Sequence, residues 1–295
     1  MSEAAVPQGT RPKTFDVGRL GVYAVLIVAS LFFLIPLWVM LMTSFKTMAE
    51  IREGQILSWP SAFTAEAWPK AWLSACTGLT CDGVRVGFWN SVSILIPSVI
   101  ASIALGALTG YAMTFYRVRG ANLLFAILLI GAFIPYQVFI YPMVRVFSLI
   151  GIYNSLLGIV VVHVIFGLSL MTLLFRNYFS SLPVELFNAA RVDGAGFFTI
   201  LRHVILPMSA PIIIVATILQ VTGIWNDFIL GLTFAGRDYR PMTVLLNNIV
   251  NSTQGEAAYN VDTAATILTA LVPLAVYFAS GRWFVRGVAA GAVKG

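Results

Sequence analysis

Hydrogen-bonding side chains interrupt one long apolar run in the second half of the chain. At about 100° per helical residue, the residues that share one arc of roughly 160° are Gln220, Thr222, Gly223, Asn226 and Asp227. Amides and hydroxyls of this kind can exchange hydrogen bonds with water for hydrogen bonds with a hydroxyl-bearing solute. Such a stripe therefore predicts a hydrated path for a neutral polar molecule.

Two aromatic residues belong to the same prediction, because the faces of Trp225 and Tyr136 can stack on the apolar side of a ring. The predicted path residues are Tyr136, Gln220, Thr222, Trp225 and Asn226. The alternative is that these polar groups join helices to one another, as they also do in membranes. The sequence leaves both interpretations open.

Motifs for catalysis and for ATP binding are absent from the sequence. It contains no Gly-x-x-x-x-Gly-Lys-Ser/Thr phosphate loop, no His-Glu-x-x-His and no Gly-x-Ser-x-Gly. His163 and His203 are far apart and have no cysteine partner, and we interpret His163 as a hydrogen-bonded interior residue. We therefore expect no catalytic residue, no bound metal and no cofactor in this chain.

The composition places these residues in a membrane. Hydrophobic residues make up 59% of the 295 residues, charged residues 10%, and the mean hydropathy is +0.89. Soluble domains are roughly 45–50% apolar. A bilayer core about 30 Å thick requires about 20 helical residues. Six uncharged stretches of that kind predict an all-α membrane protein, with spans at 20–45, 86–116, 120–144, 155–175, 204–226 and 263–281.

The basic residues predict the orientation, since they are retained on the cytoplasmic side during insertion. With the N-terminus inside, bases exceed acids in the inner segments and balance them in the outer ones. We therefore expect both termini to be cytoplasmic. The predicted parts are an N-terminal segment (1–19), a six-helix domain (20–287) with its largest cytoplasmic loop at 176–203, and a C-terminal tail (288–295). No basic patch is interleaved with exposed aromatics, so a nucleic-acid partner is not expected.

The cytoplasmic loop is predicted to form a helix, a tight turn and a second helix. Ser181 can cap the first helix, Pro183 suits its first turn, Glu185 favours the positive end of its dipole, and Gly194 can end it in a left-handed conformation. Phe187 offers an aromatic knob for a partner's pocket. Physical chemistry alone leaves open a helix on lipid headgroups or a solvated connection.

The stretch "NAARVDGAGFFTILRHVILPMSAP" resembles the signature loop of the permease subunits of ATP-driven, binding-protein-dependent importers. That pattern runs Glu-Ala-Ala, two residues, Asp-Gly-Ala and, about a dozen residues later, Leu-Pro. The residues in register are Ala189, Ala190, Asp193, Gly194, Ala195, Leu206 and Pro207. Asn188 stands in place of the glutamate of the pattern, and Glu185 lies one turn earlier. The stretches "LMTSFKTMAEI", "FWNSVSI", "IWNDFILGL" and "VRGVAAGAVKG" are similar to the carbohydrate-uptake branch, in its maltose-transporter-like subunits, and most of all to glucose/mannose-type permeases.

The resemblance implies a coupling helix between spans four and five that docks on an ATPase subunit. The implied docking residues are Glu185, Phe187, Asn188, Ala189, Ala190, Asp193, Gly194 and Ala195. The implied partners are a second homologous permease subunit, two ATP-binding subunits that hold ATP and Mg, and a periplasmic sugar-binding protein, with lipid around the spans. The implied location is a bacterial inner membrane, and the implied function is import of a sugar such as glucose or mannose.

Two outer segments complete the expectations. The resemblance implies that a stretch before the last span contacts the binding protein, namely Asn251, Ser252, Thr253, Gln254, Gly255 and Glu256; the alternative is a flexible connection. Cys76 and Cys81 are close together outside the cytoplasm, which favours a disulfide over a metal site.

Other solutes and another transport class stay open as alternatives. An importer of the same kind could carry a disaccharide, a sugar alcohol, a glycoside, a polyamine or a phosphonate, although the uncharged spans favour a neutral solute. A self-contained secondary transporter or channel usually couples through ionisable residues at the midplane. Such residues are scarce here, so that class is the less favoured one.

Overall fold

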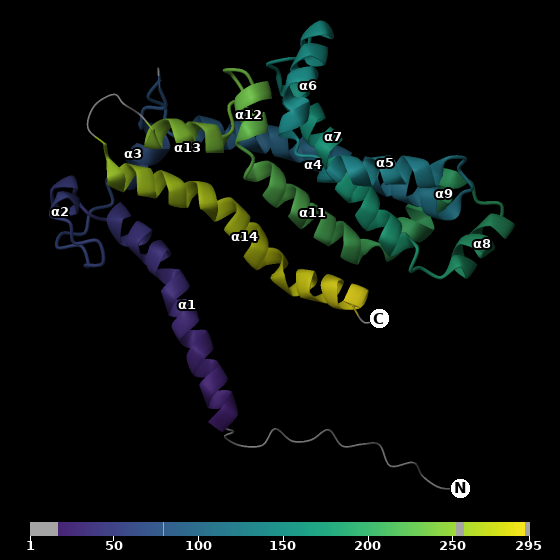
Figure 1. Cartoon of the computed structure of the whole chain (residues 1–295), viewed down its shortest axis with the longest axis horizontal. Coiled ribbons are helices and arrows are strands. Elements are labelled where there is room, and N and C mark those ends of the chain that lie inside the picture. Colours follow the sequence, from purple (N-terminus) through teal and green to yellow (C-terminus); the bar gives the residue numbers. More distant parts are fainter. Residues whose placement is uncertain (1–16, 79, 252–256, 293–295) are drawn as a thin grey trace.

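The computed structural model describes residues 17–78, 80–251 and 257–292, and within these ranges it contains helices and turns but no strand (Figure 1). The long helices are α1 (Val17–Ser44), α4 (Arg85–Phe115), α7 (Leu156–Phe179), α11 (Ala210–Trp225) and α14 (Tyr259–Ala292). Among the described residues, four helical stretches are long and apolar enough to cross a membrane, within α1, α4, α7 and α14. Two bent helix pairs raise the number to six if each pair is one span. The predicted all-α membrane class is confirmed.

The bundle is built around α4 and α7, which lie side by side (Figure 1). Two glycines of α4 allow this approach. A Cβ atom at Gly106 would lie 2.3 Å from the Cβ of Met171, and one at Gly110 would lie 2.9 Å from the backbone nitrogen of Arg176. Small residues let membrane helices pack with their backbones close together. The α4–α7 pair therefore forms the frame on which the other helices are arranged.

The third predicted span is not one continuous helix. It consists of α5 (Ala121–Phe133) and α6 (Gln137–Leu149), which meet at an angle of 109°. Pro135 causes the break, because a proline disfavours the helical conformation of the residue before it. Ile134 is accordingly extended, with ψ 128°.

The fifth predicted span is also shorter than expected, since the continuous helix α11 begins at Ala210. Before it lie α9 (Phe197–Ile200), a π-helical turn (Leu201–Ile205) and α10 (Leu206–Met208), bent by 82° from α11. Pro207 and Pro211 lack the backbone N–H that a continuous ladder would need. Periodicity of apolar residues could not reveal either bend, because both sides of each break are equally apolar.

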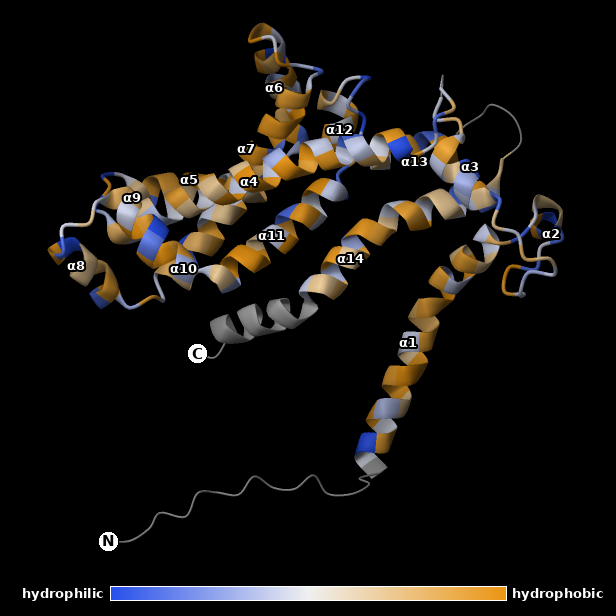
Figure 2. Ribbon diagram, turned by 180° about the vertical axis from the view of Figure 1, so that it is seen from behind, coloured by the Kyte–Doolittle hydropathy of each residue, from blue (hydrophilic) through white to orange (hydrophobic). Residues whose placement is uncertain are grey.

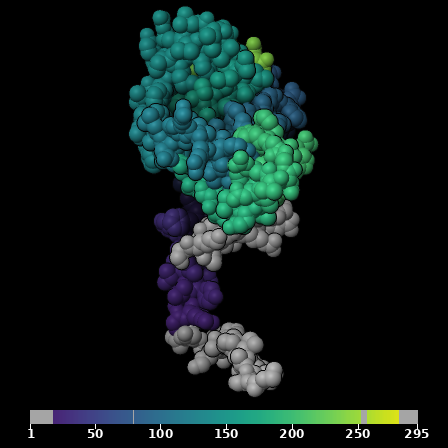
Figure 3. Space-filling view, turned by 90° about the vertical axis from the view of Figure 1, so that its right-hand side faces the viewer, coloured from purple at the N-terminus to yellow at the C-terminus, as the bar shows by residue number. Residues whose placement is uncertain are grey.

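The two ends of the bundle carry different elements (Figure 1). At one end lie α8 (Val184–Val192) and α9, and at the other lie α2 (Met48–Arg52), α3 (Ala67–Leu73) and α13 (Met242–Val250). The short helix α12 (Ile229–Phe234) joins α11 to α13. Figure 3 views the molecule from the side that carries α8, with α1 projecting below the bundle in purple.

Helix α1 stands apart from the frame and packs mainly against α14. Its side chains from Leu20 to Leu37 are mostly exposed, and Figure 2 shows them as apolar along most of its length. An exposed apolar helix of this length requires lipid or another protein around it.

Candidate functional site

A cavity of about 600 Å³ opens where the start of α6, the middle of α7 and the end of α11 meet. Its polar side chains are Tyr136, His163, Gln220, Asn226 and Asp227, and the rest of its wall is apolar or aromatic. A concave, largely apolar cavity with a few convergent polar groups is the usual form of a small-molecule site. The volume is sufficient for a small polar solute.

Gln220 gives the strongest indication that a ligand binds in this cavity. Its side chain is only 7% exposed, and its amide nitrogen Nε2 has no hydrogen-bond partner in the part of the chain that the structure describes. Gly167 on α7 makes room for it, since a Cβ there would lie 2.2 Å from Nε2. A buried polar group without a partner costs about 1–3 kcal/mol. A hydroxyl-bearing ligand in the cavity would offset this cost.

Asp227 connects the cavity to the next helix. Its carboxylate accepts hydrogen bonds from the backbone N–H groups of Leu230 (3.3 Å) and Gly231 (2.8 Å) at the start of α12. The same carboxylate lies 3.9 Å from Nε2 of His163. Its main-chain oxygen accepts a hydrogen bond from the hydroxyl of Thr243 on α13 at 2.5 Å. Asp227 is therefore held from three directions at the edge of the cavity.

Aromatic side chains form another part of the wall. The rings of Tyr136 and Phe166 meet edge to face with centroids 5.7 Å apart. Aromatic surface can cover the apolar side of a ring-shaped solute while the amides bind its hydroxyls. The cavity thus combines the two kinds of contact that a neutral polyhydroxylated molecule needs.

Three of the predicted path residues, Tyr136, Gln220 and Asn226, line this one cavity, and two do not. Trp225 is 1% exposed, and its indole N–H donates to the main-chain oxygen of Thr269 at 3.0 Å. Thr222 also lies outside the cavity. At about 100° per residue, both side chains point well away from the middle of the cavity face, which lies near Gly223 and Asp227. Trp225 does not line this cavity, because its position on α11 faces α14.

Sequence analysis missed the contribution of α7. Phe166 and Gly167 were not singled out, and His163 was interpreted only as an interior residue, whereas all three line the cavity. Their spacing of three and four residues places them on one face of a helix, which is the signal that could have grouped them. Nothing in the sequence alone indicated that this face of α7 meets the polar face of α11.

The second functional region is the loop around α8. The left-handed conformation predicted for Gly194 is confirmed, with φ +81°. The predicted cap at Ser181 is wrong: α8 begins at Val184, and the hydroxyl of Ser181 donates to the main-chain oxygen of Tyr178. A helix that started at Ser181 would place Leu182 directly before Pro183 in a helical conformation, which proline disfavours.

Phe187 does not offer a knob to a partner. It is 3% exposed and stacks on Phe115 at the end of α4, with ring centroids 4.7 Å apart. It also meets Tyr116 edge to face at 5.6 Å. Its prediction as a docking residue was wrong, because the aromatic end of α4 covers it within the same chain. Phe187 instead attaches α8 to the bundle.

The other predicted docking residues divide by exposure. Ala190 and Ala195 are partly buried beside the aromatic cluster. The exposed ones are Glu185, Asn188, Ala189, Asp193 and Gly194. These exposed residues are small or hydrophilic, and Figure 2 shows hydrophilic positions on parts of α8.

The remaining predicted residues lie at the opposite end. Cys76 and Cys81 form a disulfide in the structure. Asn251 ends α13 and is exposed, whereas Ser252, Thr253, Gln254, Gly255 and Glu256 lie outside the described residues. Across the described ranges, no group of three or more His, Cys, Asp or Glu side chains could hold a metal ion.

Comparison with known proteins identifies the architecture. The profile of the family described as "Binding-protein-dependent transport system inner membrane component" matches residues 102–290, more than half of the chain. The chain belongs to this family. It is therefore an inner-membrane transport component rather than an enzyme, and the family implies a binding protein and ATP-hydrolysing subunits as partners.

Individual relatives agree with this assignment. The osmoprotective compounds uptake permease protein GgtD of Synechocystis is 35% identical over 73% of this chain and 72% of its own length. The alpha-glucoside transport system permease protein AglG of Rhizobium meliloti is 34% identical over 79% of this chain and 63% of its own length. The glucose import system permease protein GlcU of Saccharolobus solfataricus is 29% identical over 91% of this chain and 92% of its own length.

A solved structure supports the fold. One chain in the crystal structure of a bacterial ABC transporter involved in the import of the acidic polysaccharide alginate matches with a TM-score of 0.77 and 20% identity. The match covers 93% of this chain and 100% of that one. The two chains therefore share one fold over nearly their whole length.

Proposed function

We propose that this chain is a membrane-spanning subunit of an ATP-driven importer that carries a neutral sugar, specifically a monosaccharide such as glucose or mannose. The observation that carries the proposal is the cavity with the unpartnered amide of Gln220, the amide of Asn226 and the aromatic wall at Tyr136 and Phe166. Sugar hydroxyls would supply the missing partner of Gln220, and the aromatic wall would cover the apolar face of the ring.

The printed names of the relatives support a sugar but differ in which one. GlcU is named for glucose, AglG for alpha-glucosides, and the XacI protein of Haloferax volcanii for xylose and arabinose. GgtD is named for osmoprotective compounds, which favours the alternative of a glycoside or a sugar alcohol. A disaccharide is a further alternative, because the cavity of about 600 Å³ is larger than one hexose requires.

The proposed assembly places α8 and both termini in the cytoplasm. The exposed face of α8, at Asn188, Ala189 and Asp193, meets one of two ATP-binding subunits, which hold the ATP and Mg. A second homologous permease subunit and lipid cover the apolar length of α1. The binding protein approaches the end that carries α3 and α13.

The test is sugar uptake by the reconstituted complex, normalised to the amount assembled. Gln220→Leu keeps a side chain of similar size but removes its amide, so we expect uptake of the transported sugar to fall about tenfold or more, corresponding to about 1.4 kcal/mol. Thr222→Val is the matched control, because Thr222 lies on the same helix but outside the cavity. It should retain uptake near that of the unaltered complex.

Thiol labelling separates transport from packing. Gln220→Cys and Asn226→Cys should react with a water-soluble thiol reagent, and glucose or mannose delivered by the binding protein should block the reaction. Labelling is specific because the two native cysteines are bonded to each other. Normal uptake by Gln220→Leu, together with thiols that stay unreactive in every nucleotide state, would exclude this cavity from the path.

A further inference from the structure

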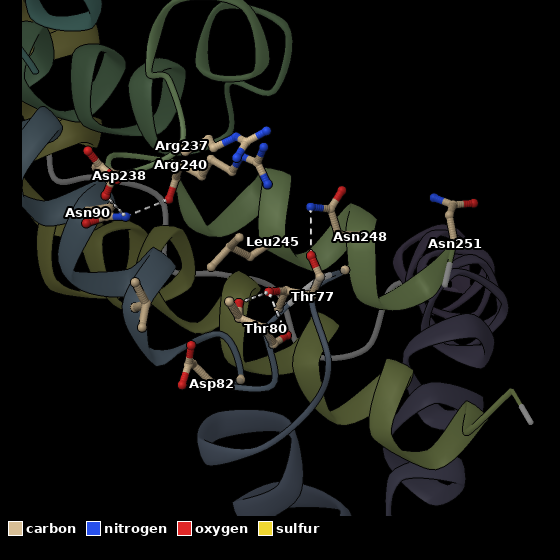
Figure 4. A pocket seen from close by; sticks show the side chains of 13 residues that line it. Thr77, Thr80, Asp82, Asn90, Arg237, Asp238, Arg240, Leu245, Asn248 and Asn251 are labelled. Carbon is tan, nitrogen blue, oxygen red and sulfur yellow. Dashed lines mark hydrogen bonds between the residues drawn. The ribbon is translucent and has the colours of Figure 1, made fainter. Parts of the chain in front are cut away.

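A second cavity, of about 650 Å³, lies at the end of the molecule opposite α8 (Figure 4). Its walls are the disulfide loop with Thr77 and Thr80, the start of α4 with Asn90, and the turn between α12 and α13. In contrast to the first cavity, it is lined by two arginines. None of the roles assigned above accounts for them.

Two arginines of the α12–α13 turn give this cavity a positively charged side. The side chains of Arg237 and Arg240 extend in the same direction in Figure 4, and their guanidinium groups lie beside each other. Within the described residues, neither guanidinium forms a hydrogen bond or an ion pair. Asp238 stands between them in sequence, but Figure 4 shows its side chain turned towards Asn90 and away from the guanidinium groups.

The turn that presents the arginines is held firmly. The side-chain amide of Asn90 donates to the main-chain oxygens of Asp238 and Arg240, both at 3.0 Å. The next turn is tied to α4 as well, since the backbone N–H of Met242 donates to the hydroxyl of Ser91 at 2.8 Å. Two adjacent cations on a fixed backbone lose little freedom when they bind an anion.

The facing wall offers hydrogen-bonding groups rather than a counter-charge next to the arginines. The amide of Asn248 donates to the main-chain oxygen of Thr77 at 3.1 Å, which joins α13 to the disulfide loop. Asp82 lies on the far side of the cavity from the arginines in Figure 4. The cavity therefore has a cationic side, an amide floor and an acidic side.

We propose that this cavity receives a carboxylate-bearing segment of the extracytoplasmic binding protein, with Arg237 and Arg240 bound to its Asp or Glu side chains. The inference rests on the proposed function, which supplies a protein partner on this face. Guanidinium groups match carboxylates in a bidentate geometry, and a pair of unpaired arginines favours an acidic peptide over a neutral sugar. The cavity has room for a loop, and Asn251 at its edge belongs to the stretch predicted to contact that protein.

The cavity beside Arg237 and Arg240 is also connected to the first cavity. Arg240 is separated by only a few residues from Thr243, whose hydroxyl binds the main-chain oxygen of Asp227 at the edge of the solute cavity. A partner that pulls on the α12–α13 turn would therefore act on a residue of the solute site. This gives the binding protein a direct route to the path along which its cargo is released.

The first experiment measures ATPase activity of the complete complex in nanodiscs of neutral lipid, titrated with its glucose-loaded binding protein. Arg237→Gln with Arg240→Gln should raise the half-saturating concentration of binding protein about tenfold and reduce its dependence on salt. Basal ATPase activity without binding protein should not change. Arg85→Gln is the matched control, because Arg85 is exposed near this end but does not line the cavity.

The second experiment detects the contact itself. In Arg237→Lys with Arg240→Lys, a carbodiimide should join a lysine amine to a carboxylate that touches it, and mass spectrometry should identify a cross-linked peptide of the binding protein. The Lys variant should also titrate closer to the unaltered complex than the Gln variant does, since it keeps the charge.

Each contrary result has its own meaning. An unchanged half-saturating concentration in the Gln variant, with no cross-link in the Lys variant, would show that Arg237 and Arg240 do not bind carboxylates of the binding protein. The importer function would remain intact. An effect that appears only in nanodiscs with anionic lipid would overturn the proposed contact in favour of a lipid headgroup. If glucose-loaded and mannose-loaded binding protein both fail to stimulate the unaltered complex, the proposed function itself fails.

Discussion

The two ends of this subunit are attached to the same bundle by different physical means. At the α8 end, Phe187 is buried among the aromatic rings of Phe115 and Tyr116, so an apolar contact holds the loop. At the α13 end, α13 itself is buried through Met242, Val244, Leu245 and Ile249, but side-chain hydrogen bonds hold the turn before it and the disulfide loop: two from Asn90 and one from Asn248. Apolar burial is non-directional and large, whereas a hydrogen bond contributes a net 0.5–1.5 kcal/mol or so.

The difference teaches how much stability a single side chain contributes at each end. A helix anchored by a buried aromatic ring moves with the span that carries the other rings, here α4. The α12–α13 turn is held in a fixed place by hydrogen bonds, but each of these bonds contributes less free energy than the buried ring does. We therefore expect the loss of the buried ring at the α8 end to have the largest effect and the loss of one hydrogen bond at the α13 end to have the smallest, and four predictions test that ordering.

The largest effect is expected for Phe187→Ala, which should cost about 3–5 kcal/mol in packing. The loop should lose its attachment to α4, so that substrate-stimulated ATPase activity falls while the spans still insert. Limited proteolysis of the loop, together with ATPase measurements on the assembled complex, checks this. Phe198→Ala is the control, because Phe198 is 71% exposed. Equal effects of the two substitutions would show that burial of Phe187 is unimportant.

Replacing both cysteines by serine comes next. The disulfide closes a short loop, with a sequence separation of five, so its loss should cost about 2 kcal/mol, mostly as local disorder of that loop. Hydrogen exchange at 77–83 should rise while the α4–α7 pair stays protected. Mass spectrometry of non-reduced protein must first show Cys76 and Cys81 linked, and two freely alkylated thiols would contradict the structure.

Gly194→Val should cost about 1 kcal/mol or more, through backbone strain alone. A Cβ atom at this position meets no other atom within 4 Å, but φ is +81°. The end of α8 should distort and coupling of ATPase activity to sugar should weaken, without loss of membrane insertion. Gly196→Ala is the control, since Gly196 is equally uncrowded and has φ −79°. If the Val variant binds the ATPase and couples normally, α8 is not the docking element.

The smallest effect is expected for Asn248→Ala, which removes one hydrogen bond between α13 and the disulfide loop. The expected loss is about 1 kcal/mol, because water can replace the amide at this partly exposed position. Titration with binding protein should shift by about tenfold or less. Val250→Ala is the matched control, since Val250 is 48% exposed on the same helix and its side chain forms no hydrogen bond. A loss as large as that of Phe187→Ala would remove the contrast between the two ends.

Predictions from local sequence were confirmed where neighbouring residues alone determine the structure. The apolar runs identified the membrane class, and Gly194 was identified as left-handed because a helix end favours that conformation at glycine. The exposed positions Asn188, Ala189 and Asp193 lie on the predicted loop helix. Their role in docking stays a prediction.

Local sequence did not predict the burial of side chains that are covered by helices far away in the chain. Phe187 and Trp225 carry large apolar side chains, and no local signal shows which covering surface they meet. The covering surfaces come from α4 for Phe187 and from α14 and α4 for Trp225. Likewise, a polar stripe on α11 becomes a cavity only where His163 and Gly167 on α7 face it.

The sequence by itself therefore determined the apolar helices, the polar loop between two of them and the polar stripe on α11. These properties follow from composition, helical periodicity and the conformational preferences of glycine and proline, which act within a few residues. The tertiary structure alone decided the angles of 109° and 82°, the burial of Phe187 and Trp225, and the meeting of α7 with α11. Those depend on packing between segments far apart in the chain, where the shape of one helix face selects the partner of another.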